Sequence, residues 1–248
     1  MASRAVFLLV PPSEAKAPGG VLRVKKTPLD RRLGEARRMV TAAVTTALNL
    51  PELEQSRLFA VRGPLLARCR ESMGELVAGT GRYLPAWQRY DGVVWTHLES
   101  GALSEAQRSR LIIPSGFYGL STGNDLIGDY RLKMSANLPP LGNLATWWRP
   151  RISPEVAHLA AGAVLVDLLP NEHRSAIDDE MIGATCDLVR VDFVSAAGSG
   201  AAGHAAKAVK GRVARFLLDA ESADLGAFRW AGWRAQRVSG GFVVRAPR

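Results

Sequence analysis

Short apolar runs alternate with longer amphipathic stretches along this chain, and this alternation constrains the fold more than any other feature. Residues 4–10 are nearly all apolar and two prolines follow them, a pattern typical of a buried strand that ends abruptly. Further strands are predicted within residues 110–120, 157–170, 186–194 and 240–247. Helices are predicted within residues 31–50, 51–79, 157–170 and 204–218. Because strands and helices are interleaved, the predicted fold class is α/β (mixed α+β), with a mixed sheet surrounded by helices.

Two local details of this prediction depend on single residues and short windows. Asp30 is the predicted N-cap of the helix in residues 31–50, since a short acidic side chain accepts hydrogen bonds from the first backbone amides. Residues 90–98 fit either a strand or a strand that runs into a helix.

The length of 248 residues fits one large domain, and no internal repeat divides it, so we expect a single compact unit over residues 1–248. Hydrophobic residues make up 47% of the chain, which argues against disorder. The two cysteines, Cys69 and Cys186, lack the spacing of a disulfide framework or a zinc site, so no disulfide partner is expected. The apolar runs are too short for a signal-peptide core or for a membrane span of about 20 residues, which predicts a cytoplasmic protein without membrane contact.

The balance of charge is strongly basic. Thirty-two Lys and Arg residues against 23 Asp and Glu give a formal net charge of +9. A surplus of this size favours a nucleic-acid or nucleotide partner, because positive charge promotes association with phosphate. A basic protein from a lineage with Arg-rich composition is the alternative.

A compact polar set follows the first predicted strand, where Ser13, Glu14 and Lys16 lie within four residues. The loop after a buried strand is where α/β proteins commonly place ligand-binding groups. Lys16 is a candidate phosphate-binding cation, and Ser13 and Glu14 are candidates for nucleophile and base. The alternative is a solvated turn or helix start.

A glycine-rich segment, residues 115–134, combines aromatic side chains with charges of both signs. We predict a long, shaped loop, and such loops are usually functional. Arg131 is a candidate for bidentate contact with a phosphate or carboxylate, and Tyr118 or Tyr130 for stacking on a base or donating a proton. A surface pair of Arg131 with Asp129 in a structural loop is the alternative.

Residues 204–215 predict a helix with a basic face. The apolar face is formed by Val209, Val213 and Phe216. The opposite face carries His204, Lys207, Gly211 and Arg215. A glycine inside a helix costs about 1 kcal/mol relative to alanine, so Gly211 indicates that another group approaches the helix closely. Together with the free amides of the first turn, this favours an anion site over a solvated basic face.

Three other patterns are weaker. Residues 198–203, GSGAAG, match a dinucleotide-binding pattern in form, but no second strand with a terminal acid follows, so we expect a plain connection. Residues 51–79 predict two short helices around Arg62 and Gly63, either a degenerate helix–hairpin–helix or an ordinary helical hairpin. The four histidines lack metal-ligand spacing, so no metal site is predicted, although His173 follows a predicted strand.

Taken in order along nearly the whole chain, these segments resemble the YaaA peroxide-stress family. The resemblance is carried by PPSEAK (11–16), YDGVVW (90–95), SGFYG (115–119), DLIGDYRLKM (125–134), WWRP (147–150), VDLLPNEH (166–173), VRVDF (189–193), HAAKAVKGRVARFLL (204–218), FRWAGWR (228–234) and GGFVVRAP (240–247). Residues 121–124 and 196–203 depart from the family pattern.

The resemblance implies a single α/β domain of the "cantaloupe" type, in which strands and helices surround a positively charged cleft. It also implies binding to double-stranded DNA through a helix–hairpin–helix-like element, and a role in limiting oxidative damage by keeping free iron low. By position, it implies functional roles for Ser13, Glu14, Lys16, Ser115, Gly116, Tyr118, Gly119, Asp129, Tyr130, Arg131, His204, Lys207, Lys210, Gly211 and Arg215.

Two functions follow from the residues and the resemblance together. The first is binding of double-stranded DNA or nucleotide phosphates in the oxidative-stress response. Its candidate binding residues are Ser13, Lys16, Arg62, Ser115, Arg131, His204, Lys207, Lys210 and Arg215. The alternative is an enzyme acting on a nucleotide, nucleobase or other anionic small molecule, with Glu14, Lys16 and Tyr118 as catalytic candidates. No cofactor is assigned, and iron sequestration is a weaker third possibility because the sequence lacks a ligand cluster.

Overall fold

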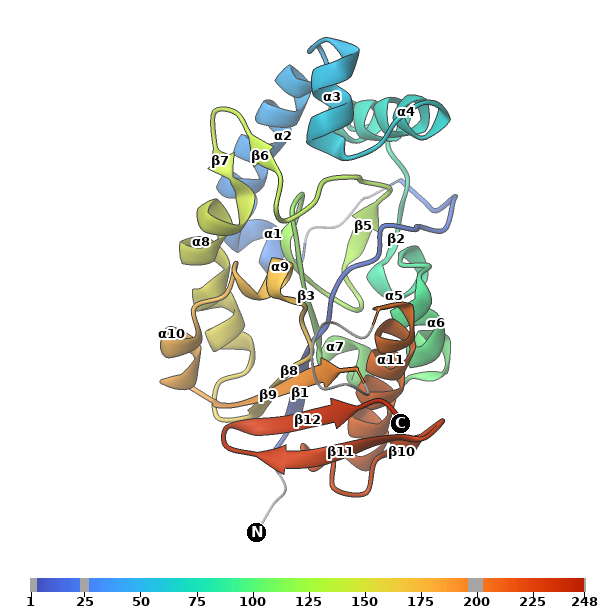
Figure 1. Ribbon diagram of the computed structural model, residues 1–248. Coiled ribbons are helices and arrows are strands. Elements are labelled where there is room, and N and C mark those ends of the chain that lie inside the picture. Colours follow the sequence, from blue (N-terminus) through green and yellow to red (C-terminus); the bar gives the residue numbers. More distant parts are fainter. Residues whose placement is uncertain (1–3, 23–26, 196–202, 248) are drawn as a thin grey trace.

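The computed structural model of the chain (Figure 1) describes residues 4–22, 27–195 and 203–247, with residues 203 and 204 described by their backbone alone. An eight-stranded mixed sheet runs in the order β10-β11-β12-β9-β8-β1-β3-β4. Its strands are β1 (Val6–Leu9), β3 (Leu111–Ser115), β4 (Gly119–Thr122), β8 (Val164–Asp167), β9 (Asp187–Val194), β10 (Arg229–Trp230), β11 (Trp233–Val238) and β12 (Gly241–Arg245). The predicted α/β class with a mixed sheet is confirmed.

Parallel pairing dominates the centre of the sheet. Strands β12, β9, β8, β1 and β3 each run parallel to their neighbours in this group, and antiparallel strands close both edges. The carboxyl ends of parallel strands meet at one edge, so the segments after β1, β8 and β9 begin close together. Two small antiparallel pairs lie outside this sheet, β2 (Tyr83–Pro85) with β5 (Leu126–Gly128) and β6 (Asn137–Leu138) with β7 (Gly142–Asn143).

Helices flank the parallel strands. In Figure 1, α8 and α10 lie on one side of β1, β3 and β8, α6 and α11 lie on the other, and α2, α3 and α4 form the upper end. The helices are α1 (Pro28–Arg32), α2 (Gly34–Ala47), α3 (Glu52–Phe59), α4 (Pro64–Ala78), α5 (Ala86–Arg89), α6 (Val93–Leu98), α7 (Glu105–Ser109), α8 (Leu144–Leu159), α9 (Asn171–Arg174), α10 (Asp179–Gly183) and α11 (Gly203–Ala220), with a 3-10 turn at Ser100–Ala102. Within the described ranges, no helix combines the length and the apolar character that crossing a membrane requires.

The segment 90–98 forms helix α6 after a short turn, so the strand prediction there is wrong. Its buried side chains Val94, Trp95 and Leu98 recur at helical spacing and pack into the core, which outweighs the strand preference of the two valines.

The N-cap prediction at Asp30 is also wrong by three residues. Thr27 is the N-cap of α1, and Asp30 is the third helical residue of a capping box, in which each side chain accepts from the other residue's amide. The chain then breaks at Leu33 before α2 begins.

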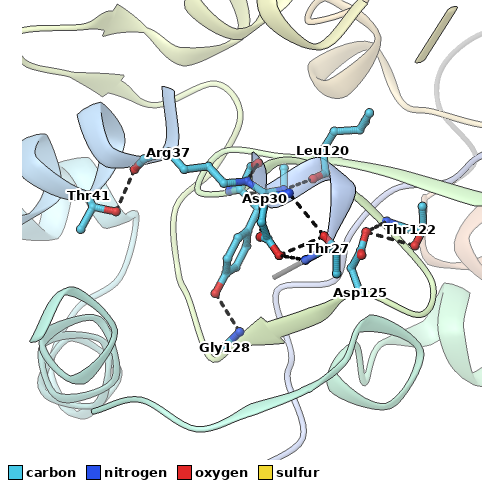
Figure 2. A network of polar contacts seen from close by, with 10 residues as sticks. Thr27, Asp30, Arg37, Thr41, Leu120, Thr122, Asp125 and Gly128 are labelled. Carbon is cyan, nitrogen blue, oxygen red and sulfur yellow. Dashed lines mark hydrogen bonds and ion pairs between the residues drawn. The ribbon is translucent and has the colours of Figure 1, made fainter. Parts of the chain in front are cut away.

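The glycine-rich segment 115–134 is more regular than a loop, since it contains β4 and β5. Figure 2 shows how it is fixed: Arg37 of α2 donates from Nε to the carbonyl oxygen of Tyr118 at 2.9 Å and from Nη2 to that of Leu120 at 2.5 Å, while pairing with Asp30. Asp125 accepts from both the amide and the hydroxyl of Thr122. The hairpin that leads to residues 130–133 is therefore tied to α1 and α2.

Candidate functional site

A pocket of about 60 Å³ lies where β1 and β8 end. Three segments that are distant in the sequence form its wall: the loop after β1, residues 130–133, and α9. The lining residues are Pro12, Ser13, Glu14, Lys16, Tyr130, Arg131, Leu132, Lys133, Glu172 and His173. Pro11 and Pro12 end β1, and the chain turns into the pocket wall directly after them.

Lys16 is the buried cation of this pocket, with 8% of its surface exposed. Its Nζ donates to the carbonyl oxygen of Ser13 at 2.9 Å and lies 4.1 Å from the centre of the Tyr130 ring. Within the described residues, no carboxylate reaches ion-pair distance of this ammonium. Burial lowers the pKa of Lys16 to about 7, and the positive charge of Arg131 adds to this effect while Asp129 opposes it.

Glu14 is an exposed acidic residue of the pocket wall, and two cations pair with it. Its carboxylate pairs with Lys133 at 3.0 Å and with Arg131 at 3.6 Å, and 63% of the side chain is exposed. Partial burial alone would raise the pKa of Glu14, but the hydrogen bond from Lys133 and the charges of Lys133, Arg131 and Lys207 outweigh it and lower the pKa. The surroundings of Glu14 therefore stabilise a negative charge at this point.

Arg131 and Lys133 lie two residues apart, and both pair with the carboxylate of Glu14, so their side chains lie on the same side of this segment. The sequence places Lys133 in this position, but the prediction named only Arg131. The alternation of the two basic residues was the signal that would have found Lys133.

Tyr130, rather than Tyr118, is the aromatic residue of the pocket. Its hydroxyl lies 2.7 Å from that of Tyr90, and burial raises the pKa of Tyr130 to about 12. Tyr118 does not line the pocket; its hydroxyl accepts from the amide of Gly128 at 2.8 Å, which fixes β5 (Figure 2). Ser115 is fully buried, and its hydroxyl accepts from the amide of Tyr118 at 3.3 Å. The structure thus places Tyr118 and Ser115 in the scaffold and does not bring them to the pocket.

Ser13 contributes its backbone carbonyl oxygen to the pocket wall, and its side chain packs on Gly92. Its carbonyl oxygen accepts from Lys16, and its side chain packs so closely on Gly92 that a Cβ there would overlap it. Gly92 precedes α6, so this contact joins the pocket loop to that helix.

His173 is a half-buried residue of the pocket wall. Its Nδ1 atom is buried and has no hydrogen-bond partner in the described part of the chain. Burial lowers its pKa to about 4; the charge of Glu172 opposes this shift and that of Lys210 adds to it, so the imidazole is neutral at pH 7. Lys210 is itself 8% exposed, and burial lowers its pKa to about 8. The described residues contain no group of three or more His, Cys, Asp or Glu side chains arranged to hold a metal ion.

A buried carboxylate supports the helix that carries His173. Asp167, at the end of β8, pairs with Nε of Arg174 at 2.6 Å and accepts from the amide of Leu169 at 2.8 Å. Arg174 also pairs with Asp192 at 3.1 Å. These contacts fix α9 to the ends of β8 and β9.

The basic face predicted on residues 204–215 divides between different partners. Lys207 is exposed, and its charge helps to lower the pKa of Glu14. The charge of Lys210 helps to lower the pKa of His173. Arg215 pairs instead with Glu99 at 3.2 Å and with Asp219 at 2.7 Å, about two turns further along α11. The side chain of His204 lies outside the described residues. So do residues 198–202 of the glycine-rich segment 198–203.

The group that approaches Gly211 is protein and not a ligand. A Cβ at this position would overlap the carbonyl oxygen of Val94 and lie 2.8 Å from Cβ of His97, because α6 packs directly on α11. Arg62 is exposed in the turn between α3 and α4 and does not line the pocket. Of the predicted site residues, the structure therefore gathers Ser13, Glu14, Lys16 and Arg131 at the pocket, with Lys207 and Lys210 beside it.

Comparison with known proteins identifies relatives over nearly the whole chain. Residues 6–238 match the family model described as "Peroxide stress protein YaaA". A UPF0246 protein of Corynebacterium efficiens is 26% identical over 217 residues, which cover 86% of this chain and 84% of the relative. A UPF0246 protein of Corynebacterium glutamicum is 28% identical over 223 residues, which cover 87% of this chain and 86% of the relative. The chain belongs to the YaaA peroxide stress protein family.

Proposed function

We propose that the pocket at the ends of β1 and β8, which Glu14 lines, binds the phosphate group of a nucleotide or of DNA. We propose further that this binding serves the response to peroxide for which the family is named. The observation that carries the proposal is the convergence of Arg131, Lys133 and Lys207 on one exposed carboxylate. Cations from two distant segments stabilise negative charge at a single point, and Glu14 occupies that point when no other anion does.

The size of the pocket supports a phosphate group rather than a whole nucleotide. A water molecule needs about 10–15 Å³ of such space, so a pocket of 60 Å³ has room for about four waters. The sugar and base of a bound nucleotide, or the rest of a duplex, would lie outside it. The net charge of +9 favours the approach of such polyanions.

The test is a titration of a fluorescent DNA duplex and of adenosine monophosphate at two salt concentrations. We expect affinity for the duplex to fall with salt, with a log–log slope of about −0.9 for each phosphate contact. Lys133→Gln should weaken binding about tenfold, because it removes one charge-assisted contact. Arg38→Gln removes the same charge from an exposed position on α2 and is the matched control. Absent binding at low salt, or equal effects of the two variants, would contradict the proposal.

A second candidate function is an enzyme acting on a nucleotide, nucleobase or other anionic small molecule. The observation that favours it is Lys16: a buried amine with a pKa of about 7 exchanges protons readily near neutral pH, as catalytic lysines do. Glu14→Ala separates the two candidates. If the pocket only binds phosphate, removal of this carboxylate strengthens binding, because the phosphate no longer competes with it. If the pocket is catalytic and uses Glu14, turnover of the nucleotide, followed by chromatography, is lost.

A further inference from the structure

We propose that Lys16 is a covalent binding site, at which its amine condenses with the carbonyl group of a small anionic carbonyl compound, such as a 2-oxo acid or a phosphorylated ketose, to form an imine. The inference deepens the second candidate function and rests on the anion pocket proposed above. It is carried by the position, surroundings and burial of this one lysine.

The position of Lys16 makes it available to a ligand in the pocket although it is buried. It lines the pocket together with Arg131 and Lys133, and its Nζ is held by the Ser13 carbonyl oxygen on one side and faces the Tyr130 ring on another. No carboxylate within the described ranges pairs with this Nζ. An unpaired, desolvated amine is the form in which lysine acts as a nucleophile toward carbonyl groups.

Burial favours the neutral form of Lys16. It lowers the pKa to about 7, so the unprotonated amine is well populated near neutral pH. The charged and titratable groups that face it are Asp129, Arg131, Glu14 and Arg89, with the rings of Tyr90 and Tyr130. Arg131 and Arg89 lower the pKa and Asp129 and Glu14 raise it, with burial as the largest influence.

The pocket also selects the class of carbonyl compound. Space for about four waters admits a short-chain compound and excludes a sugar with an attached base. Arg131 and Lys133, which now hold Glu14 at 3.6 and 3.0 Å, are placed to bind a carboxylate or phosphate of the ligand instead. An anionic group on the ligand would thus present its carbonyl carbon to the pocket that contains Nζ.

The reaction requires no co-reactant. The lone pair of Nζ forms a bond to the carbonyl carbon, and the electrons of the C=O bond move to oxygen. A proton passes from nitrogen to that oxygen and gives a carbinolamine. The second nitrogen proton then leaves with the hydroxyl group as water, and a C=N bond remains. Added borohydride then transfers hydride to the carbon and converts the imine into a stable secondary amine that mass spectrometry detects.

Lys210 is an internal control that distinguishes access to the pocket from burial alone. It is as buried as Lys16, and burial lowers its pKa to about 8, but it does not line the pocket. Lys133 is the opposite control, because it lines the pocket and pairs with Glu14 but is more exposed. Reaction at Lys16 alone requires both features together.

The test treats the folded chain at pH 7 with pyruvate, with dihydroxyacetone phosphate or with neutral dihydroxyacetone, each in the presence of borohydride, and maps the labelled lysines by peptide mass spectrometry. We expect both anionic probes to label Lys16 at least about tenfold faster than Lys133 or Lys210, because Lys16 alone among these three lysines combines burial with pocket access. Dihydroxyacetone should label it at least about tenfold more slowly, because it lacks the group that Arg131 and Lys133 bind. The rate at Lys16 should level off above about pH 8, because its pKa is about 7.

Labelling spread evenly over the lysines, or fastest at Lys133 or Lys210, would overturn the proposal, and the map of the unaltered chain decides this without any variant. Lys16→Arg should abolish the fast labelling and leave only the slow reaction of the other lysines, and Arg131→Gln should slow labelling by the anionic probes only. Equal rates with dihydroxyacetone and its phosphate would overturn the anionic class and count against the anion pocket too. Binding of adenosine monophosphate without labelling of Lys16 would overturn the imine and leave the phosphate pocket standing.

Discussion

Arg89 holds the loop that carries Lys16. It is 1% exposed, and its guanidinium donates to four carbonyl oxygens: those of Ala17, Gly19, Arg82 and Ile127. Two of these acceptors, Ala17 and Gly19, lie within three residues after Lys16, so Arg89 is a positioning residue for the pocket wall. No sequence pattern marks Arg89 for this role, because arginine is rarely buried and its partners here are backbone atoms scattered over 110 residues of chain.

The first prediction concerns the stability that Arg89 supplies. Arg89→Met removes the donor from one buried and three partly buried carbonyl oxygens, and we expect the free energy of unfolding in urea to fall by about 3 kcal/mol or more. Arg38→Met, at an exposed position on α2, is the control and should change it by less than about 0.5 kcal/mol. Similar small changes for both variants would show that the Arg89 contacts contribute little.

The second prediction concerns the pH dependence that Lys16 adds. Its pKa is lowered from 10.5 to about 7 on folding, so the unfolded chain binds more protons than the folded chain between these values. Stability therefore rises with pH in this window, by at most about 1.4 kcal/mol per pH unit for one group. Between pH 7 and 9 the free energy of unfolding should rise by up to about 2 kcal/mol more in the unaltered chain than in Lys16→Met. Identical slopes in urea titrations of the two proteins would exclude a lowered pKa.

At the scale of elements, the packing of α11 on α6 depends on Gly211. The sequence predicted α11 and the close approach to this glycine, but it did not reveal that another helix makes the approach. The packing partner of a helix depends on the tertiary arrangement, whereas its apolar spacing is local, which is why the two differ in predictability. The same reason explains α6 itself, where local strand preference lost to burial of Val94 and Trp95.

The third prediction uses two glycines that both lie inside helices. Gly211→Ala should lower the free energy of unfolding by about 1–3 kcal/mol, because the new Cβ overlaps the Val94 carbonyl oxygen and forces α6 and α11 apart. Gly74→Ala in α4 meets no atom within 4 Å, so it should raise stability by up to about 1 kcal/mol through helix propensity alone. Urea unfolding of both variants measures this, and a stabilising Gly211→Ala would contradict the described contact.

At the scale of the whole molecule, the parallel pairing of β1 and β8 places the segments that follow these strands side by side, and both segments line the pocket. The sequence predicted the α/β class and the importance of the loop after β1 and of residues 115–134, since these follow from strand ends and glycine-rich composition. It did not predict which cations surround the carboxylate of Glu14, because that depends on how the strands are ordered in the sheet. Arg215 and Lys207 have equivalent local patterns, yet one pairs with Glu99 and the other acts on Glu14.

The fourth prediction concerns the competition between Glu14 and a bound anion, and it tests the central claim that Arg131, Lys133 and Lys207 are arranged for a negatively charged guest. Glu14→Gln removes the charge that these cations now neutralise, and the shape of the side chain stays nearly the same. Calorimetric titration with adenosine monophosphate should then show affinity about tenfold higher than that of the unaltered chain, because the phosphate no longer competes with a carboxylate. Affinity that is unchanged or lower in Glu14→Gln would contradict the claim.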